Sequence, residues 1–274
     1  MSAASKSSRS AALLLALYRN EERSGWSVGM RAITRSLIAQ ATLPDGPAAE
    51  LGCGGGHVLA ELGSLLPGRL LTGMDLHPQA LSHAAQVTGD AAHLTQAHLH
   101  RLPWPDDAFA LLLALDALDQ RGVRLTLALR EAWRVLAVDG VLLLRVSAGP
   151  WLLGPHDVAF NTGRRYTRRT LDQALRRTGF TPERVTYANS VLAAPIAALR
   201  LLQRWRLLPF APSLYNTPGI DALLAAALRC EARWLERHDL PAGLSLYVAA
   251  RKNVRAQPTH SLRTPDTIGE PAHG

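Results

Sequence analysis

A run of glycines between two apolar segments constrains this chain more than any other feature. Glu50 closes an apolar lead-in, Gly52, Gly54 and Gly56 follow at alternate positions, and a second apolar run begins at Val58. Glycine adopts the left-handed backbone of a tight turn and lets a ligand approach the bare main chain. The amides that open the following helix point outward and need polar partners. The stretch therefore predicts a strand, a sharp turn and a helix built around a ligand.

Two classes of cofactor use such a turn. A dinucleotide site needs Gly-x-Gly-x-x-Gly, and His57 stands where the third glycine belongs. The pattern acid-x-Gly-x-Gly-x-Gly is met in full, and it resembles the first motif of the class I S-adenosylmethionine-dependent methyltransferases. A carboxylate suits that cofactor, which carries an ammonium group and a sulfonium cation. The resemblance implies that S-adenosylmethionine is bound by Glu50, Gly52, Cys53, Gly54 and Gly56, with Cys53 as a small packing residue.

A second acid lies at the end of the next predicted strand. Asp75 stands just under twenty residues past the last turn glycine, where an acid accepts hydrogen bonds from ribose hydroxyls. Leu76 follows it, and we expect both to contact the cofactor. The alternative is that Asp75 is the N-cap of a helix that begins at Pro78.

The segment from Arg101 to Phe109 resembles the Leu-Pro, acid, Phe segment of the quinone-biosynthesis-like branch of these enzymes. That branch usually places an Asp four residues before the Leu, to bind the adenine amino group. His98 occupies this position, and a neutral histidine can also accept a hydrogen bond. The resemblance therefore implies an adenine contact by His98, with Leu99 contributing through its backbone.

A continuous apolar run from Ala110 to Leu115 ends at Asp116. Such runs are typical of a central parallel strand that is covered on both faces. Ligands bind at the carboxyl ends of strands in open α/β sheets, so we expect Asp116 at the cofactor. Methylases of exocyclic base amines usually carry Asn or Asp, Pro, Pro and an aromatic residue here, and the absence of this sequence disfavours base N-methylation.

Five alternating strand and helix units between residues 47 and 147 predict a doubly wound α/β sheet with right-handed crossovers. The resemblance implies a mostly parallel, seven-stranded, Rossmann-like methyltransferase fold whose last strand is antiparallel. The final two strands are expected at 184–190 and 243–251, separated by a helical insertion. The predicted regions are an N-terminal segment with a helix (1–27), the cofactor-binding core (28–148), a substrate-side region (149–252) and a disordered tail (253–274).

Polar residues after the fifth strand are candidates for catalysis. His156 and Asp157 can form a base and its orienting partner. In the alternative, Asp157 caps a short helix and His156 is a packed loop residue. Methyl transfer needs little beyond alignment of the reactants, so a base is not required. Further along, Glu231 falls on the apolar stripe of a long helix, as either a partnered buried acid or a ligand-binding group.

The resemblance of residues 151–180 to an uncharacterised methyltransferase subgroup implies a small-molecule or lipid- or saccharide-linked acceptor. The 274-residue chain has a net charge of +8, which also allows an RNA methyltransferase, although we consider nucleic acid an improbable partner. A catalytically silent cofactor-binding protein is a third alternative, because His98 replaces the usual Asp. The two cysteines lack zinc-ligand spacing and indicate a reducing compartment, so we expect a cytoplasmic protein without a metal.

The stretch 191–211 is apolar but interrupted by arginines. It is too short and too charged to span a bilayer. Arginine-flanked apolar segments of this kind lie in membrane interfaces, which predicts a peripheral membrane contact. A core-packing helix or a homodimer helix is the alternative.

Overall fold

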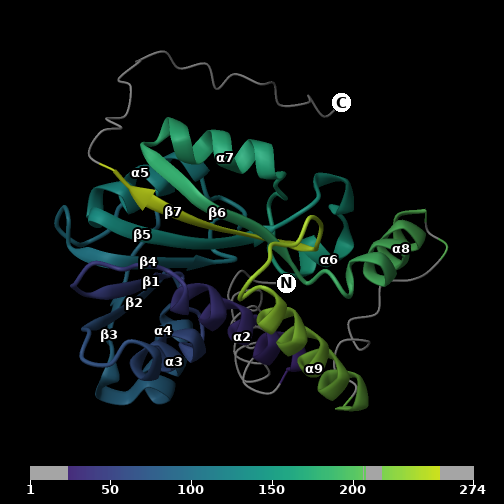
Figure 1. The fold of residues 1–274 in the computed structure, drawn as a ribbon, viewed down its shortest axis with the longest axis horizontal. Coiled ribbons are helices and arrows are strands. Elements are labelled where there is room, and N and C mark those ends of the chain that lie inside the picture. The colour runs from purple at the N-terminus through teal and green to yellow at the C-terminus, as the bar shows by residue number, and fades with distance from the viewer. Residues whose placement is uncertain (1–23, 206, 208–217, 254–274) are drawn as a thin grey trace, which may run out of the picture.

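In a computed structural model, which describes residues 24–205, 207 and 218–253, a seven-stranded sheet lies between two layers of helices (Figure 1). Residues 1–23 of the predicted N-terminal segment and the predicted tail, apart from Asn253, lie outside the described residues. The strands are β1 (Ala48–Leu51), β2 (Leu71–Asp75), β3 (His93–Gln96), β4 (Phe109–Leu115), β5 (Leu136–Ser147), β6 (Phe180–Ala188) and β7 (Ser245–Lys252).

The helices alternate with the strands along the core and then form the insertion. They are α2 (Gly25–Ala39), α3 (His57–Leu65), α4 (Pro78–Thr88), α5 (Leu125–Val135), α6 (Pro155–Ala159), α7 (Arg168–Arg177), α8 (Ala193–Arg204) and α9 (Pro218–Trp234), with single 3-10 turns at η1 (Gly89–Ala91) and η2 (Pro150–Leu152). Thr167 caps α7, because its hydroxyl accepts a hydrogen bond from the Thr170 amide at 3.1 Å.

The sheet has the strand order β3-β2-β1-β4-β5-β7-β6. The first five strands are parallel, whereas β7 is antiparallel to both β5 and β6. The predicted doubly wound fold with an antiparallel last strand is confirmed. Because β1, β2, β4 and β5 run in the same direction, their carboxyl ends meet at one edge of the sheet.

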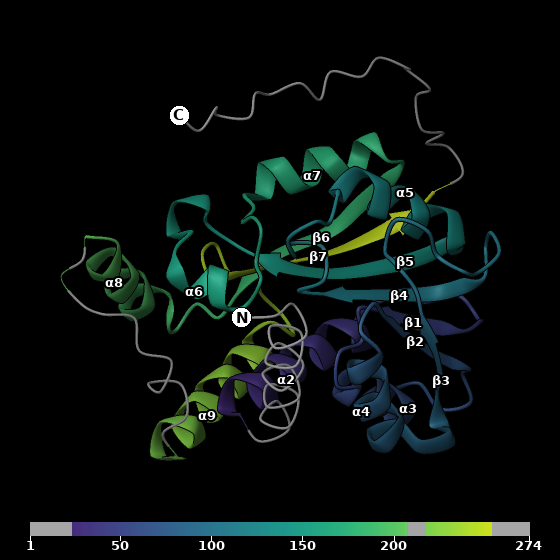
Figure 2. The same cartoon turned by 180° about the vertical axis from the view of Figure 1, so that it is seen from behind.

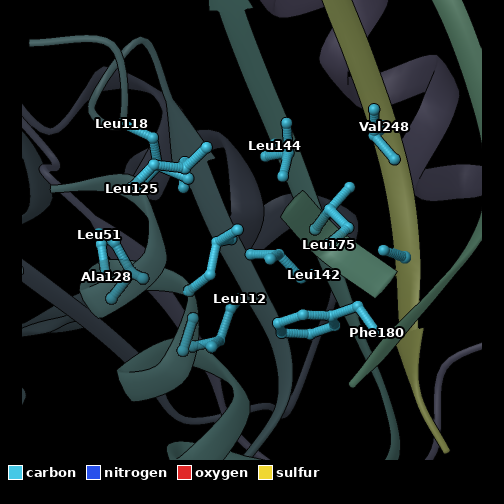
Figure 3. Packing of buried hydrophobic residues seen from close by; sticks show 14 of the residues in the cluster. Leu51, Leu112, Leu118, Leu125, Ala128, Leu142, Leu144, Leu175, Phe180 and Val248 are labelled. Atoms are coloured by element: carbon cyan, nitrogen blue, oxygen red, sulfur yellow. The ribbon is translucent and has the colours of Figure 1, made fainter. Parts of the chain in front are cut away.

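Both faces of the sheet are covered, and β4 shows how the sequence achieves this. Leu112 and Ala114 belong to the core that packs against α5 and α7. Figure 3 shows Leu112 among its neighbours in this core. Leu111 and Leu113 point into a second core, beneath α2, α3 and α9. The alternation of side chains along a strand therefore requires apolar residues at every position of β4.

Two strands begin earlier than predicted. The sequence places a turn at Asp139–Gly140 before the fifth strand, but β5 begins at Leu136 and contains that turn as a bulge. Leu136 pairs with Phe109, and the register then shifts so that Val141 pairs with Leu111. Asp139 adopts a φ of +61° inside this bulge. Likewise, β6 begins at Phe180 instead of Arg184, because its first residues pair with the end of β7.

Helices α2 and α9 lie side by side below the sheet, although about 180 residues separate them in the chain (Figure 2). Gly25 and Gly29 lie on the face of α2 that contacts α9. A Cβ atom on Gly25 would stand 1.9 Å from the Asp221 carbonyl oxygen, and one on Gly29 would stand 2.4 Å from the Leu228 Cβ. Glycine at both positions lets the two backbones approach closely. The apolar stripe predicted on α9 thus packs against α2, which runs across the predicted boundary at residues 27 and 28.

Candidate cofactor site

The glycine turn has the backbone that its sequence requires. Gly52, Gly54 and Gly56 have φ angles of +74°, +50° and +81°. The amides of Gly52 and Cys53 both donate to the Met74 carbonyl oxygen at 2.8 Å, which ties the turn to the end of β2. Side chains would not fit, since a Cβ on Gly52 would lie 2.8 Å from the Ala117 Cβ. A Cβ on Gly56 would lie 2.9 Å from Ala84.

The Asp75 carboxylate, at the end of the neighbouring strand, is hydrogen-bonded to the glycine turn. Its Oδ2 accepts a hydrogen bond from the Gly54 amide at 3.1 Å, and its Oδ1 accepts one from the His77 amide at 2.9 Å. The N-cap of α4 is His77, so Asp75 is not the N-cap. Each carboxylate oxygen has a second lone pair, and the residue is partly exposed. Asp75 can therefore accept bonds from ribose hydroxyls while it holds the turn.

These residues fit S-adenosylmethionine. Glu50 lies buried at the end of β1, and Asp75 at the end of β2, so two carboxylates flank the bare backbone of the turn. Gly56 is the N-cap of α3 and has no side chain, so it gives the amides of the first helical turn no side-chain hydrogen bond. Leu76 follows Asp75 with a half-exposed side chain that could cover an apolar ring face. Cys53 is buried, as expected of a packing residue.

The predicted adenine contact lies on the loop after β3. His98 is exposed, and its Nδ1 accepts a hydrogen bond from the His100 amide at 3.1 Å. The two imidazole rings are 4.4 Å apart. Leu99 is partly buried against the core under α5 and α7. An adenine contact by His98 or Leu99 stays a prediction, and the Nδ1 of His98 already has a local donor.

Asp116 directly follows β4 and belongs to a network that the sequence did not predict. Its φ is +54°, and its carboxylate accepts from Nη2 of Arg145 at 2.7 Å and from Nε at 3.0 Å. Arg145 is buried, donates to the Tyr247 hydroxyl at 3.1 Å and lies over the Trp26 ring at 5.3 Å. The Tyr247 hydroxyl in turn pairs with that of Thr34 at 2.8 Å. The signal in the sequence was a single arginine inside an apolar strand.

Asp119 is the second acid at this edge, and its side chain is almost completely buried. Its Oδ2 accepts from the Ser147 amide at 2.8 Å, whereas Oδ1 has no hydrogen-bond partner within the described part of the chain. Burial, reinforced by the negative charge of Asp116, raises the pKa of Asp119 to about 6, although hydrogen bonds from Ser147 act in the opposite direction. Nothing in the local sequence distinguishes this acid from a turn residue.

The stretch around residue 163 covers Asp119. The Gly163 amide donates to the Asp119 carbonyl oxygen at 2.7 Å, and the Arg121 amide donates to the Asn161 carbonyl oxygen at 2.9 Å. A Cβ on Gly163 would lie 2.9 Å from the Arg121 Cα. The loop after β4 and the segment between β5 and α7 therefore pack backbone to backbone at the cofactor edge.

His156 and Asp157 lie on α6, within that same segment. The buried Asp157 carboxylate accepts from Nη2 of Arg165 at 2.7 Å and from the Gly154 amide at 2.9 Å. The ring of His156 lies 4.5 Å from that of Phe160, at an interplanar angle of 44°. These contacts correspond to the structural alternative, in which Asp157 caps the helix. A catalytic role for His156 and Asp157 stays a prediction.

The sequence left two alternatives for Glu231, and the structure shows the first, a buried acid with hydrogen-bond partners. Its carboxylate accepts from the amides of Asn189, Ser190 and Val191, just beyond the end of β6. Burial raises its pKa, and these three hydrogen bonds partly offset that effect. The acid therefore joins α9 to the end of β6.

Comparison with known proteins agrees with this geometry. Residues 49–144 match the family model described as a methyltransferase domain. The uncharacterised methyltransferase YodH of Bacillus subtilis (strain 168) is 34% identical over 119 residues. That alignment covers 42% of this chain and 49% of YodH, so the match spans about half the length of this curated relative.

Solved structures show the same fold at low sequence identity. A complex of the Haloferax volcanii Trm112 methyltransferase activator with a methyltransferase matches with a TM-score of 0.57 at 17% identity, over 87% of this chain and 94% of that one. Geranyl diphosphate C-methyltransferase from Streptomyces coelicolor A3(2), solved with S-adenosyl-L-homocysteine, gives 0.55 at 14% identity, over 81% and 78%. The [4+2]-cyclase SpnF gives 0.54 at 22% identity, over 81% and 82%.

The family match covers β1 to β5, and with them the glycine turn, Asp75 and Asp116. The family match therefore indicates a methyltransferase domain over residues 49–144, and the glycine turn and Asp75 within it fit S-adenosylmethionine as the cofactor.

Proposed function

We propose that the whole chain transfers a methyl group from S-adenosylmethionine directly to a small-molecule or lipid- or saccharide-linked acceptor. The observation that carries this proposal is the bond between Asp75 and the Gly54 amide, which joins the second acid to the glycine turn. We also place the chain in the quinone-biosynthesis-like branch, in an uncharacterised subgroup with a C-terminal helical insertion. The Leu102–Pro103 segment supports the branch, and α8 and α9, inserted between β6 and β7, support the subgroup.

Bound S-adenosylmethionine supplies a methyl group on a sulfonium sulfur, which keeps the electron pair of the broken C–S bond. In this proposal Glu50 and Asp75 hold the cofactor, and the end of β4 faces the acceptor. An oxygen or nitrogen acceptor forms the new bond and must lose a proton. Holding the two reactants in line supplies most of the acceleration.

Asp119 is the group at this edge best suited to take that proton. Its pKa of about 6 makes it a carboxylate at neutral pH with a usable basicity, and its Oδ1 is still without a partner in the described structure. Asp119→Asn should abolish the change of kcat with pH near pH 6 and leave the affinity for the cofactor unchanged.

Calorimetry with S-adenosylhomocysteine tests the cofactor site. Asp75→Ala removes a charged acceptor from two backbone amides and from the ribose, so we expect affinity to fall about 10- to 100-fold. Asp90→Ala, an exposed acid on η1, is the matched control and should bind as the native chain does. Equal binding by Asp75→Ala and the native chain would remove the basis of the proposal.

Turnover separates an enzyme from a silent cofactor-binding protein. Incubation of metabolite and lipid extracts with a donor labelled in its methyl group should yield a labelled product with the native chain and much less with Asp75→Ala. Cofactor binding without any labelled product would favour the silent alternative. Steeply salt-dependent binding to copurified RNA would favour the RNA alternative, for which the site offers no specific support. A homodimer and a cytoplasmic location stay predictions.

A further inference from the structure

Exposed apolar side chains are concentrated in one part of the chain. Of the twelve large apolar side chains that are exposed in the described residues, seven come from the stretch between 151 and 207. We name these seven the apolar surface: Trp151, Leu153, Val158, Phe160, Val191, Trp205 and Leu207. Isolated exposed apolar residues are normal, but a concentration of them marks a contact site.

The apolar surface is carried by neighbouring elements at the periphery. Helix α8 contacts η2, and η2 leads into α6. Both views show α8 standing away from the sheet, beyond α6 (Figures 1 and 2). None of the described helices is long and apolar enough to cross a bilayer.

Apart from one acid, the charged residues of 149–170 and 191–207 are all arginines. Residues 191–207 contain Arg200, Arg204 and Arg206 and no acid. Residues 149–170 contain a single acid, Asp157, which is buried against Arg165. Arg164, Arg168 and Arg169 of this second stretch are exposed. Exposed tryptophans among arginines are the composition of a surface that lies in an anionic membrane interface.

We propose that the apolar surface docks on an anionic lipid bilayer. A second copy of the chain fits less well, because a two-fold contact would set this basic surface against itself. The segment that carries Trp151 and Phe160 begins directly after β5, at the edge of the sheet that holds the cofactor site. Docking through it brings the acceptor side of that edge to the membrane, where a lipid-linked acceptor is held.

Vesicle co-sedimentation of the full chain tests the proposal. The native chain should bind vesicles of phosphatidylcholine mixed with phosphatidylglycerol, bind phosphatidylcholine alone much less, and be released by high salt. The double variant Trp151→Ser/Trp205→Ser should bind the anionic vesicles at least tenfold more weakly. Trp234→Ser is the matched control, because Trp234 lies on α9, outside the apolar surface, and is 54% exposed, as is Trp151.

Three results would overturn the proposal. The first is that the native chain does not bind anionic vesicles. The second is that Trp234→Ser loses as much vesicle binding as the double variant. The third is that the native chain is a dimer in solution and the double variant is a monomer. Affinity for S-adenosylhomocysteine, measured on the same samples, should be unchanged in every variant, which shows that the variants are folded. Vesicle binding without cofactor binding would count against the proposed function alone.

Discussion

At the scale of the single residue, Asp119 makes stability depend on pH. Its pKa in the folded chain is about 6, above the usual value of 3.8, so the folded state binds more protons than the unfolded state between these values. Stability therefore falls as the pH rises from about 4 to about 6, by roughly 3 kcal/mol in total. Below about pH 4, Asp119 is protonated and neutral, and its full contribution to folding stability is present.

Asp119→Asn removes this titration and keeps an oxygen for the Ser147 amide. We expect the free energy of unfolding of the variant, relative to the native chain, to rise by about 3 kcal/mol between pH 4 and pH 7. Urea unfolding at one-unit steps across this range measures it. Parallel curves for the two proteins would show that Asp119 ionises normally in the fold.

The Arg145–Asp116 pair is a second prediction at this scale. Arg145→Met leaves the Asp116 carboxylate and the Tyr247 hydroxyl without their buried donor, which should cost about 2–4 kcal/mol of unfolding free energy. The double variant Arg145→Met/Asp116→Asn should cost less than the sum of the single changes, because no uncompensated charge is left. Additive losses in chemical denaturation would contradict a direct coupling.

At the scale of the element, the contact between α2 and α9 depends on glycine. Gly25→Ala would place a methyl group 1.9 Å from a backbone oxygen of α9, so the helices must separate. We expect a loss of about 2 kcal/mol or more in thermal or urea unfolding. Gly63→Ala on α3 is the control, since its Cβ meets only Leu71 at 3.7 Å, and it should stabilise by about 0.5–1 kcal/mol.

Elements that depend on local pattern could be predicted from the sequence. Apolar residues at helical spacing predict a helix over Trp26–Gln40, which is observed as α2, one residue displaced. The apolar run at Ala110–Leu115 is observed as β4. The bulge in β5 could not be predicted, because Asp139–Gly140 has the sequence of a turn. Pairing on both sides of that turn, with Phe109 and Leu111, decides that the strand passes through it.

At the scale of the whole molecule, we expect the core to fold without α8, which is inserted between β6 and α9. The end of β6 is already fixed to α9 by Glu231, about 20 Å along that helix from Pro218. Replacing residues 192–217 by a flexible linker of about ten residues spans this distance easily. We expect cofactor affinity to stay within about twofold, measured by calorimetry. Vesicle binding should weaken, because Trp205, Leu207 and the arginines of this stretch are removed. A chain that no longer folds would show that the insertion is part of the core.

The sequence by itself determined the strand–turn–helix around Gly52–Gly56, the acid Asp75 and the parallel sheet, because each follows from backbone freedom or from the period of apolar residues. Only the tertiary structure decided that Asp116 pairs with Arg145 and that Asp119 is buried. These are contacts between chain segments about 30 residues apart, and a pKa depends on what surrounds a side chain in space. The local order of residue types therefore could not predict the ion pair of Asp116 or the burial of Asp119.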